Sequence, residues 1–318
     1  MSQRAFYRAF GLVIASEQHI TSLDQVESQP HDVEIKRVSL DHQFDESGLQ
    51  TEFANWKAGP YGLLLRIDDV ADLNVRDGQR IEIKPAIGAS DEVISAFLMG
   101  SAFATLLQQR RLLTLHASAV MGPRGAALFV GRSGIGKSTT MSALLACGYK
   151  MVTDDVAAIG FGEDGVPRIR PSFPGARLTA RALKKLGKSE REYRRLDAEI
   201  EKFAFPTSLV GKTEIGVDCV FVLDVGAESE VAVRQVSQGE AFQSLSRYTF
   251  RKRFYDGMGM QDFHFDAVSR LAAAIPVWNV VRPEHPFLLD ELINRLVDRI
   301  ETTPVQAATD ARRAGSPV

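Results

Sequence analysis

The chain has 318 residues, and its 45% hydrophobic content is enough for a core in one large or two modest domains. Its 38 basic and 40 acidic side chains give a net charge of −2, which argues against a broad nucleic-acid-binding or membrane-binding surface. No apolar run approaches the roughly 18 residues that a membrane span needs. The two cysteines lack metal-ligand spacing and predict buried, reduced thiols in a cytoplasmic protein.

Residues 1–88 have the pattern of short strands separated by polar turns, which predicts a β-rich N-terminal domain with a substrate-binding or structural role. The strands expected there are 6–14, 33–38, 62–67 and 80–84. Ser90-Asp91-Glu92 is typical of a capped helix start, and the apolar spacing extends this helix to about Gln109.

One glycine-rich segment fits the phosphate-loop pattern G-x-x-x-x-G-K-[ST] at every fixed position. Its glycines would let backbone N–H groups point at a polyphosphate, and the helix that follows would add a favourable dipole. We expect Lys137 to reach the phosphates of ATP and the Ser138 hydroxyl to hold Mg²⁺. The residues expected to contact the nucleotide are Gly131, Arg132, Ser133, Gly134, Ile135, Gly136, Lys137, Ser138 and Thr139.

The segments around the phosphate loop have the strand and helix character that its chemistry requires. The apolar run 126–130 leads into the loop, and the helix-compatible run 139–146 leads out of it. A further strand-like run, 112–120, is joined to the first by the turn 122–125. This arrangement predicts an antiparallel hairpin that feeds the loop, followed by further strands at 149–153, 156–161, 166–170, 217–223, 231–236 and 277–281 and helices at 178–202, 267–274 and 287–300.

Two acidic residues, Asp154-Asp155, follow the strand expected at 149–153. In phosphate-loop proteins a carboxylate at the end of a neighbouring strand meets Mg²⁺. Adjacent side chains in an extended segment point to opposite sides, so the pair can divide between the metal and the attacking group. Paired acidic residues are also ordinary turn formers. His116 alone is more typical of a hydrogen-bonded core residue, but the hairpin would bring it alongside the loop.

The stretches 115–120, 131–138 and 152–156 resemble the catalytic core of HPr kinase/phosphorylase in order and spacing. The resemblance implies an α/β phosphate-loop kinase core with a mixed β-sheet and flanking helices. It also implies transfer of the γ-phosphoryl group of ATP to a serine hydroxyl. Asp154 would be the general base, with Lys137 and His116 beside the phosphates, and Asp155 and Ser138 would serve Mg²⁺.

The stretches 7–12, 115–120, 174–178 and 276–278 resemble the HPr-kinase-like proteins encoded with lasso-peptide and related peptide-modification genes, some of which phosphorylate a serine of a precursor peptide. Arg177 and Lys202 are candidates for contacts with substrate or the γ-phosphate. The chain has Thr139 where the regulatory kinases carry Glu, and it lacks their glycine-rich C-terminal signature. HPr as a substrate, and the reverse phosphorylase activity, are therefore not favoured.

We accordingly expect a β-rich domain at 1–88, an HPr-kinase-like catalytic domain at 89–301 and a disordered tail at 302–318. The expected function is that of a cytoplasmic serine kinase, a phosphotransferase that uses ATP and Mg²⁺ on a peptide or protein. It is expected to be a homo-oligomer without nucleic-acid or membrane partners. The alternative is a nucleotide-hydrolysing or nucleotide-sensing protein that binds a partner and phosphorylates nothing. The acceptor and the preference for ATP or GTP stay open.

Overall fold

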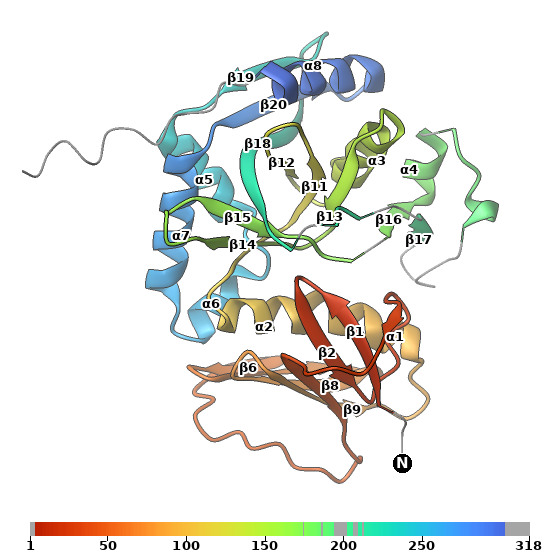
Figure 1. Ribbon diagram of the computed structural model, residues 1–318, viewed down its shortest axis with the longest axis vertical. Helices are drawn as coiled ribbons and strands as arrows, with labels where there is room; N and C mark the ends of the chain where they lie inside the picture. Colours follow the sequence, from red (N-terminus) through yellow and green to blue (C-terminus); the bar gives the residue numbers. More distant parts are fainter. Residues whose placement is uncertain are drawn as a thin grey trace, which may run out of the picture.

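The computed structural model describes residues 4–173, 175–185, 187–193, 202–205, 209–211 and 213–302. It has a mixed α/β architecture in which two large mixed sheets are flanked and joined by helices (Figure 1). Thr302 ends the last described helix, and the rest of the tail expected at 302–318 lies outside the described residues. No helix within the described residues is both long and apolar enough to cross a membrane.

The N-terminal sheet has the strand order β3-β1-β2-β4-β9-β8-β7-β6-β5. Its neighbours are antiparallel except for β2 with β4 and β4 with β9, which are parallel. The β-rich character expected for this part of the chain is confirmed. The strands are β1 (Ala5–Ala9), β2 (Leu12–Ser16), β3 (Gln25–Val26), β4 (Val33–Arg37), β5 (Thr51–Phe53), β6 (Trp56–Gly59), β7 (Gly62–Ile67), β8 (Ala71–Arg76) and β9 (Arg80–Pro85).

The first strand predicted from the sequence, 6–14, is wrong as a single element. The backbone reverses at Phe10 and Gly11, which both have positive φ angles (53° and 72°), so that β1 and β2 form a tight hairpin. The sequence predicts one continuous strand here because Phe10, in the turn between β1 and β2, is itself apolar and buried. Nothing in the alternation of apolar residues marked this turn.

A helical layer lies between the N-terminal sheet and the rest of the molecule (Figure 1). It begins at Ser90, whose hydroxyl accepts a hydrogen bond from the N–H of Val93 at 3.4 Å, as the capped start predicts. The expected continuous helix is instead interrupted by a π-helical turn. The three parts are α1 (Asp91–Phe97), η1 (Leu98–Ala102) and α2 (Phe103–Gln109).

The second sheet has the strand order β10-β14-β15-β18-β12-β11-β13, and β20 pairs in parallel with β18 and antiparallel with β19. β12 lies parallel to β18, whereas β11 and β12 form the antiparallel hairpin that the sequence predicts. The strands are β10 (Leu113–Leu115), β11 (Ala117–Met121), β12 (Ala126–Val130), β13 (Lys150–Thr153), β14 (Ala157–Phe161), β15 (Pro167–Arg170), β18 (Ile215–Gly226), β19 (Ala232–Gln235) and β20 (Val277–Pro283).

Helices cover both faces of this second sheet (Figure 1). Successive residues of β12 point to opposite faces, so Phe129 packs with α3 and α8, whereas Leu128 packs with α5 and α7. Burial on both faces explains why the strand has no polar alternation. These helices are α3 (Lys137–Ala146), α5 (Gln238–Arg247), α7 (Gln261–Ala274) and α8 (Leu289–Thr302). The short helix α6 (Lys252–Gly257) packs instead against β6 of the N-terminal sheet.

A small two-stranded sheet, β16 (Ala176–Thr179) with β17 (Lys202–Phe205), lies beside α3. The helix expected at 178–202 is therefore wrong at its ends, and α4 (Ala180–Lys185) and a short 3₁₀ turn, η2 (Glu190–Glu192), occupy part of its length. Residues 194–201 lie outside the described residues. The charged pattern predicts a helix, but at both ends of this region the backbone is extended because β16 pairs with β17.

The two cysteines are both unpaired, as expected for reduced thiols. Cys219 is buried in β18, and burial raises the pKa of its thiol well above the usual range. Cys147, in contrast, is exposed at the end of α3, so the expectation of a buried thiol is wrong there.

Candidate functional site

Residues 131–136 form a tight loop that joins β12 to α3. A Cβ added at Gly131 would lie 2.8 Å from the carbonyl oxygen of Leu223 and 2.9 Å from Cγ2 of Ile135. Gly131 and Gly136 also have φ angles of 153° and 114°, which L side chains rarely adopt. The strand, glycine turn and helix expected from the motif are thus present, and two of its glycines are required by local geometry.

Lys137 begins α3, and its side chain lies under the loop with only 6% exposure. Its Nζ donates hydrogen bonds to the carbonyl oxygens of Gly131 at 3.0 Å and of Arg132 at 3.3 Å. The loop therefore encloses one ammonium charge at the N-terminus of a ten-residue helix. Both the charge and the helix dipole favour an anionic group at this position.

Arg282 supports the same loop from the end of β20. This buried guanidinium donates to the carbonyl oxygen of Ile135 at 3.0 Å and to that of Pro283 at 3.0 Å. Its Cζ also lies 4.4 Å from the ring centroid of Phe287. The sequence analysis missed this residue, although a basic side chain at the end of an apolar strand was an available signal.

Asp154 follows β13 and is 8% exposed. Its Oδ1 accepts a hydrogen bond from the Ser138 hydroxyl at 2.9 Å and another from the Ser118 hydroxyl at 2.7 Å. Two hydroxyl donors on one oxygen hold the carboxylate against the first turn of α3. Ser118, on β11, was also missed; its signal is a hydroxyl within an otherwise apolar buried strand.

Asp155 has a left-handed backbone (φ 75°), so its side chain leaves the strand end in another direction from that of Asp154. Nδ1 of His116 lies 3.2 Å from Oδ1 of Asp155 and 3.1 Å from its carbonyl oxygen. Because both partners only accept hydrogen bonds, Nδ1 is the ring nitrogen that carries a proton here. His116 itself lies in the break between β10 and β11, where its N–H donates to the carbonyl oxygen of Tyr248 at 2.8 Å.

The structure thus brings the expected residues together as two pairs, Ser138 with Asp154 and His116 with Asp155. The expected division of labour put Ser138 with Asp155 at the metal and His116 beside Asp154. The contacts favour the opposite division, since the loop hydroxyl bonds to Asp154 and the imidazole to Asp155.

The remaining expected site residues are more scattered. Arg132 is exposed, with Nη2 3.9 Å from Oδ1 of Asp224, and Thr139 is buried in α3. Arg177 pairs with Ala204 in the small sheet, where Lys202 also lies, but the side chains of Arg177 and Lys202 lie outside the described parts.

The donor set at the loop fits Mg²⁺ bound together with nucleotide phosphates. Within the described chain, no group of three or more His, Cys, Asp or Glu side chains is gathered to hold a metal by itself. Mg²⁺ bound with a nucleotide needs no such cluster, because it takes one or two protein oxygens and completes its shell with phosphates and water. Oδ1 of Asp154 and Oγ of Ser138, 2.9 Å apart, are oxygens of this kind.

No protein-family model matches the chain. No curated protein matches it either. Among solved structures, it is similar to the Hpr(Ser) kinase/phosphatase from Coxiella burnetii, with 16% identity over 58% of this chain and 88% of that chain. The TM-score of this likeness is 0.30.

Proposed function

We propose that the protein is a phosphotransferase that moves the γ-phosphoryl group of Mg²⁺-ATP to a serine hydroxyl of a peptide or protein. One observation carries the proposal: a carboxylate bonded to the loop serine stands next to a second carboxylate bonded to a histidine. A protein that only hydrolyses or senses a nucleotide has less need of the second pair, Asp155 with His116, as an acceptor of a substrate proton. A kinase needs a proton acceptor next to its phosphate site.

In this proposal the loop and Lys137 hold the triphosphate, and Ser138 with Asp154 holds Mg²⁺. The bound metal ion neutralises charge on the phosphate oxygens. Ser118 fixes the orientation of Asp154 by its 2.7 Å hydrogen bond, and Arg282 fixes the loop backbone at Ile135. Positioning and fixed charge supply most of the rate in such a site, because phosphoryl transfer needs little covalent chemistry from the protein.

Asp155 is the proposed general base. Its side chain is 27% exposed, so a hydroxyl group from outside can reach it, whereas Asp154 is closed off by two serines. The Nδ1–H of His116 would hold the Asp155 carboxylate in one orientation. This assignment exchanges the roles that the sequence suggests for Asp154 and Asp155.

The proposed acceptor is a serine of a peptide or protein, as in the lasso-type precursor peptides that the sequence resemblance suggests. The N-terminal sheet offers a place for an extended peptide, since β5 is at its edge and pairs with β6 on one side. Edge strands bind extended segments through main-chain hydrogen bonds. Phe53 on this edge strand is 44% exposed.

The test is mass spectrometry of candidate peptides and proteins incubated with the protein and Mg²⁺-ATP. The expected result is one phosphate group on a serine, formed far more slowly by Asp155→Asn. ATP hydrolysis without any labelled acceptor would favour the nucleotide-hydrolysing alternative. Efficient phosphorylation of a small sugar or amino acid, with no activity on any peptide, would contradict the proposed acceptor class.

A further inference from the structure

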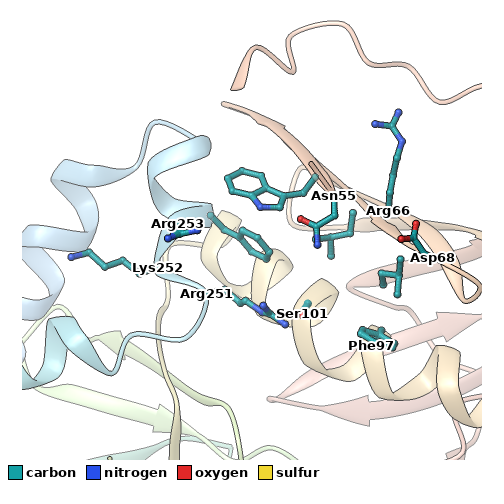
Figure 2. Close-up of a pocket in the computed structure, with 12 residues that line it drawn as sticks. Asn55, Arg66, Asp68, Phe97, Ser101, Arg251, Lys252 and Arg253 are labelled. Atoms are coloured by element: carbon teal, nitrogen blue, oxygen red, sulfur yellow. The ribbon is translucent and has the colours of Figure 1, made fainter. Parts of the chain in front are cut away.

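A cavity of about 610 Å³ lies between the N-terminal sheet, the π-helical turn and the segment that leads into α6 (Figure 2). None of residues 131–139 lines it, and neither do His116 or the paired acidic residues, so its lining residues are distinct from those of the proposed nucleotide site. Its volume falls within the roughly 300–1,000 Å³ that is usual for small-molecule sites.

The floor of the cavity is aromatic and apolar. Trp56, Leu65 and Phe254 line it and are only 7%, 5% and 4% exposed. The rings of Trp56 and Phe254 meet edge to face at 5.1 Å between centroids. Such a surface binds a flat ring or an aliphatic body.

The rim of the cavity is basic on one side, where Arg251, Lys252 and Arg253 follow one another. Lys252 points away from the other lining residues in Figure 2, and its Nζ donates to the Ser246 hydroxyl at 3.1 Å. Within the described chain, the structure pairs neither Arg251 nor Arg253 with a carboxylate. Two guanidinium groups beside an apolar cavity favour an anionic ligand, since their planar forks match carboxylate and phosphate oxygens.

The opposite side of the rim has a different charge. Arg66 is held by Glu46 at 2.6 Å, and Asp68 is exposed next to it. Figure 2 shows both on the strand side of the cavity, across from Arg251 and Arg253. A ligand with one anionic end therefore fits better than a ligand with negative charge at both ends.

Two unusual backbone segments face this cavity. Arg251 is left-handed (φ 52°, ψ 44°), a conformation that costs a non-glycine residue free energy. Ser101 lies in the π-helical turn Leu98–Ala102. Such turns are rare in proteins, and those that occur are often found at functional sites. The left-handed residue and the π-helical turn place the polar groups of Arg251 and Ser101 at the cavity. Packing the N-terminal sheet against the helices would not require polar groups there.

We propose that this cavity binds an organic anion in which a carboxylate or phosphate group is joined to an aromatic or aliphatic body. The charged group pairs with Arg251 and Arg253, and the body lies against Trp56 and Phe254. Binding is non-covalent and does not depend on the nucleotide proposed for the phosphate loop.

Tryptophan fluorescence can read this site alone. The chain has two tryptophans, Trp56 in the cavity and Trp278 on β20, so a Trp278→Phe protein reports from Trp56 only. It is titrated with phenyl phosphate, with phenylacetate and with the neutral benzyl alcohol. A saturating Mg²⁺ complex of a non-hydrolysable ATP analogue is present, so that the phosphate loop does not compete for the anions.

We expect a saturable change of Trp56 emission with at least one of the two anions and none with benzyl alcohol; the tighter anion identifies the preferred charged group. Arg251→Gln with Arg253→Gln should weaken binding at least about tenfold, because it removes both guanidinium groups that would donate charge-assisted hydrogen bonds to the anion. Arg247→Gln, an exposed charge on α5 outside the cavity, should bind like the parent.

The proposal is overturned if neither anion gives a saturable change, if benzyl alcohol binds equally well, or if the double variant keeps the parent affinity. Both arginines are exposed, so their replacement should not unfold the protein. If the double variant does unfold, Arg251→Gln and Arg253→Gln are measured separately, and parent affinity in both of them overturns the proposal.

Discussion

Asp154 and Asp155 are adjacent in the chain but have different hydrogen-bond partners, so the two carboxylates can have different roles in the site. Asp154 is nearly buried, and its Oδ1 accepts hydrogen bonds from two serine hydroxyls. Asp155 stays accessible next to His116. One carboxylate is thus fixed next to the phosphate loop, while the other is available to a second substrate.

Replacing these carboxylates one at a time should separate metal binding from proton transfer. Asp155→Asn should lower the rate of phosphoryl transfer by about 10²–10⁴-fold, because the amide cannot accept the hydroxyl proton. Nucleotide affinity should hardly change. Asp154→Asn should instead raise the Mg²⁺ concentration needed for half-maximal activity. Initial rates measured against Mg²⁺ concentration for both variants check this. Exchanged phenotypes would return the roles to the division that the sequence first suggests.

The sequence could predict part of this site and not the rest, for a physical reason. Lys137, Ser138 and the paired acidic residues belong to short motifs whose spacing along the chain is itself the signal. Ser118 and Arg282 act through contacts with residues 36 and 147 positions away. Such contacts depend on how the strands pair, which the local sequence does not encode.

At the scale of elements, the phosphate loop depends on close packing between its first glycine and β18. A methyl group at position 131 would meet the carbonyl oxygen of Leu223 at 2.8 Å, and backbone atoms cannot move aside cheaply. The loop conformation is therefore held by the neighbouring strand as well as by its own sequence.

Gly131→Ala should consequently destabilise the protein by about 1–3 kcal/mol and weaken nucleotide binding, because it adds both backbone strain and a steric clash. Gly239→Ala is the matched control. Gly239 lies in the first turn of α5 with open space around its Cα, so this change should be neutral or slightly stabilising. Denaturant unfolding of both variants measures the difference. Equal stability of the two would show that the loop tolerates a side chain at position 131.

Another element-scale prediction concerns α7, where His264 is buried and bonds to the Thr249 hydroxyl at 2.9 Å. Burial lowers the pKa of His264, and the nearby Lys252 lowers it further, against an opposing effect of Asp256. The unfolded chain, with a histidine pKa near 6.5, then binds a proton more readily than the folded protein does.

The contribution of His264 to stability should therefore be full above about pH 6.5 and decrease as the pH falls towards its lower folded pKa. His264→Gln should remove this part of the pH dependence. His31→Gln, which changes an exposed histidine, should not. Unfolding free energies measured from pH 5 to 8, the range in which histidine titrates, check this. An unchanged slope in His264→Gln would contradict it.

Some elements with strong local signals could be predicted from the sequence. The β11–β12 hairpin has a tight turn between two apolar runs, and the start of α1 has a serine cap. The helices α5 and α6 escaped prediction, although Ser237 and Glu240 form a reciprocal capping box at the start of α5. The π-helical turn has no simple sequence signal, since its hydrogen bonds span only one residue more than those of an α-helix.

At the scale of the whole molecule, one hydrophobic cluster joins the N-terminal sheet to the rest of the chain. It includes Ile35 and Leu73 from the sheet, Phe103 from α2, and Val156 and Phe254 from the part that carries the site. The backbone N–H of Phe10 also donates to the carbonyl oxygen of Ser172 at 3.1 Å. We therefore expect both sheets to unfold together.

The two tryptophans can test this, since Trp56 lies in the N-terminal sheet and Trp278 in the second sheet. Trp278→Phe and Trp56→Phe each leave one reporter. The two proteins should show denaturant transitions of the same steepness, each coinciding with the loss of helical circular dichroism, as two-state unfolding requires. Separate transitions in one protein would show that the N-terminal sheet folds on its own.

The central claim is that residues 131–138 hold the phosphates of a nucleotide, and calorimetry with a non-hydrolysable ATP analogue and Mg²⁺ tests it most directly. The native protein should bind the analogue, and Lys137→Ala should lose about 1.5–3 kcal/mol of binding free energy, which is the contribution of a hydrogen bond to a charged group. Lys150→Ala is the control, because this exposed lysine lies at the other end of β13 from the acidic pair. It should bind the analogue like the native protein. Equal affinity of the native protein and Lys137→Ala, or no binding by either, would contradict the account.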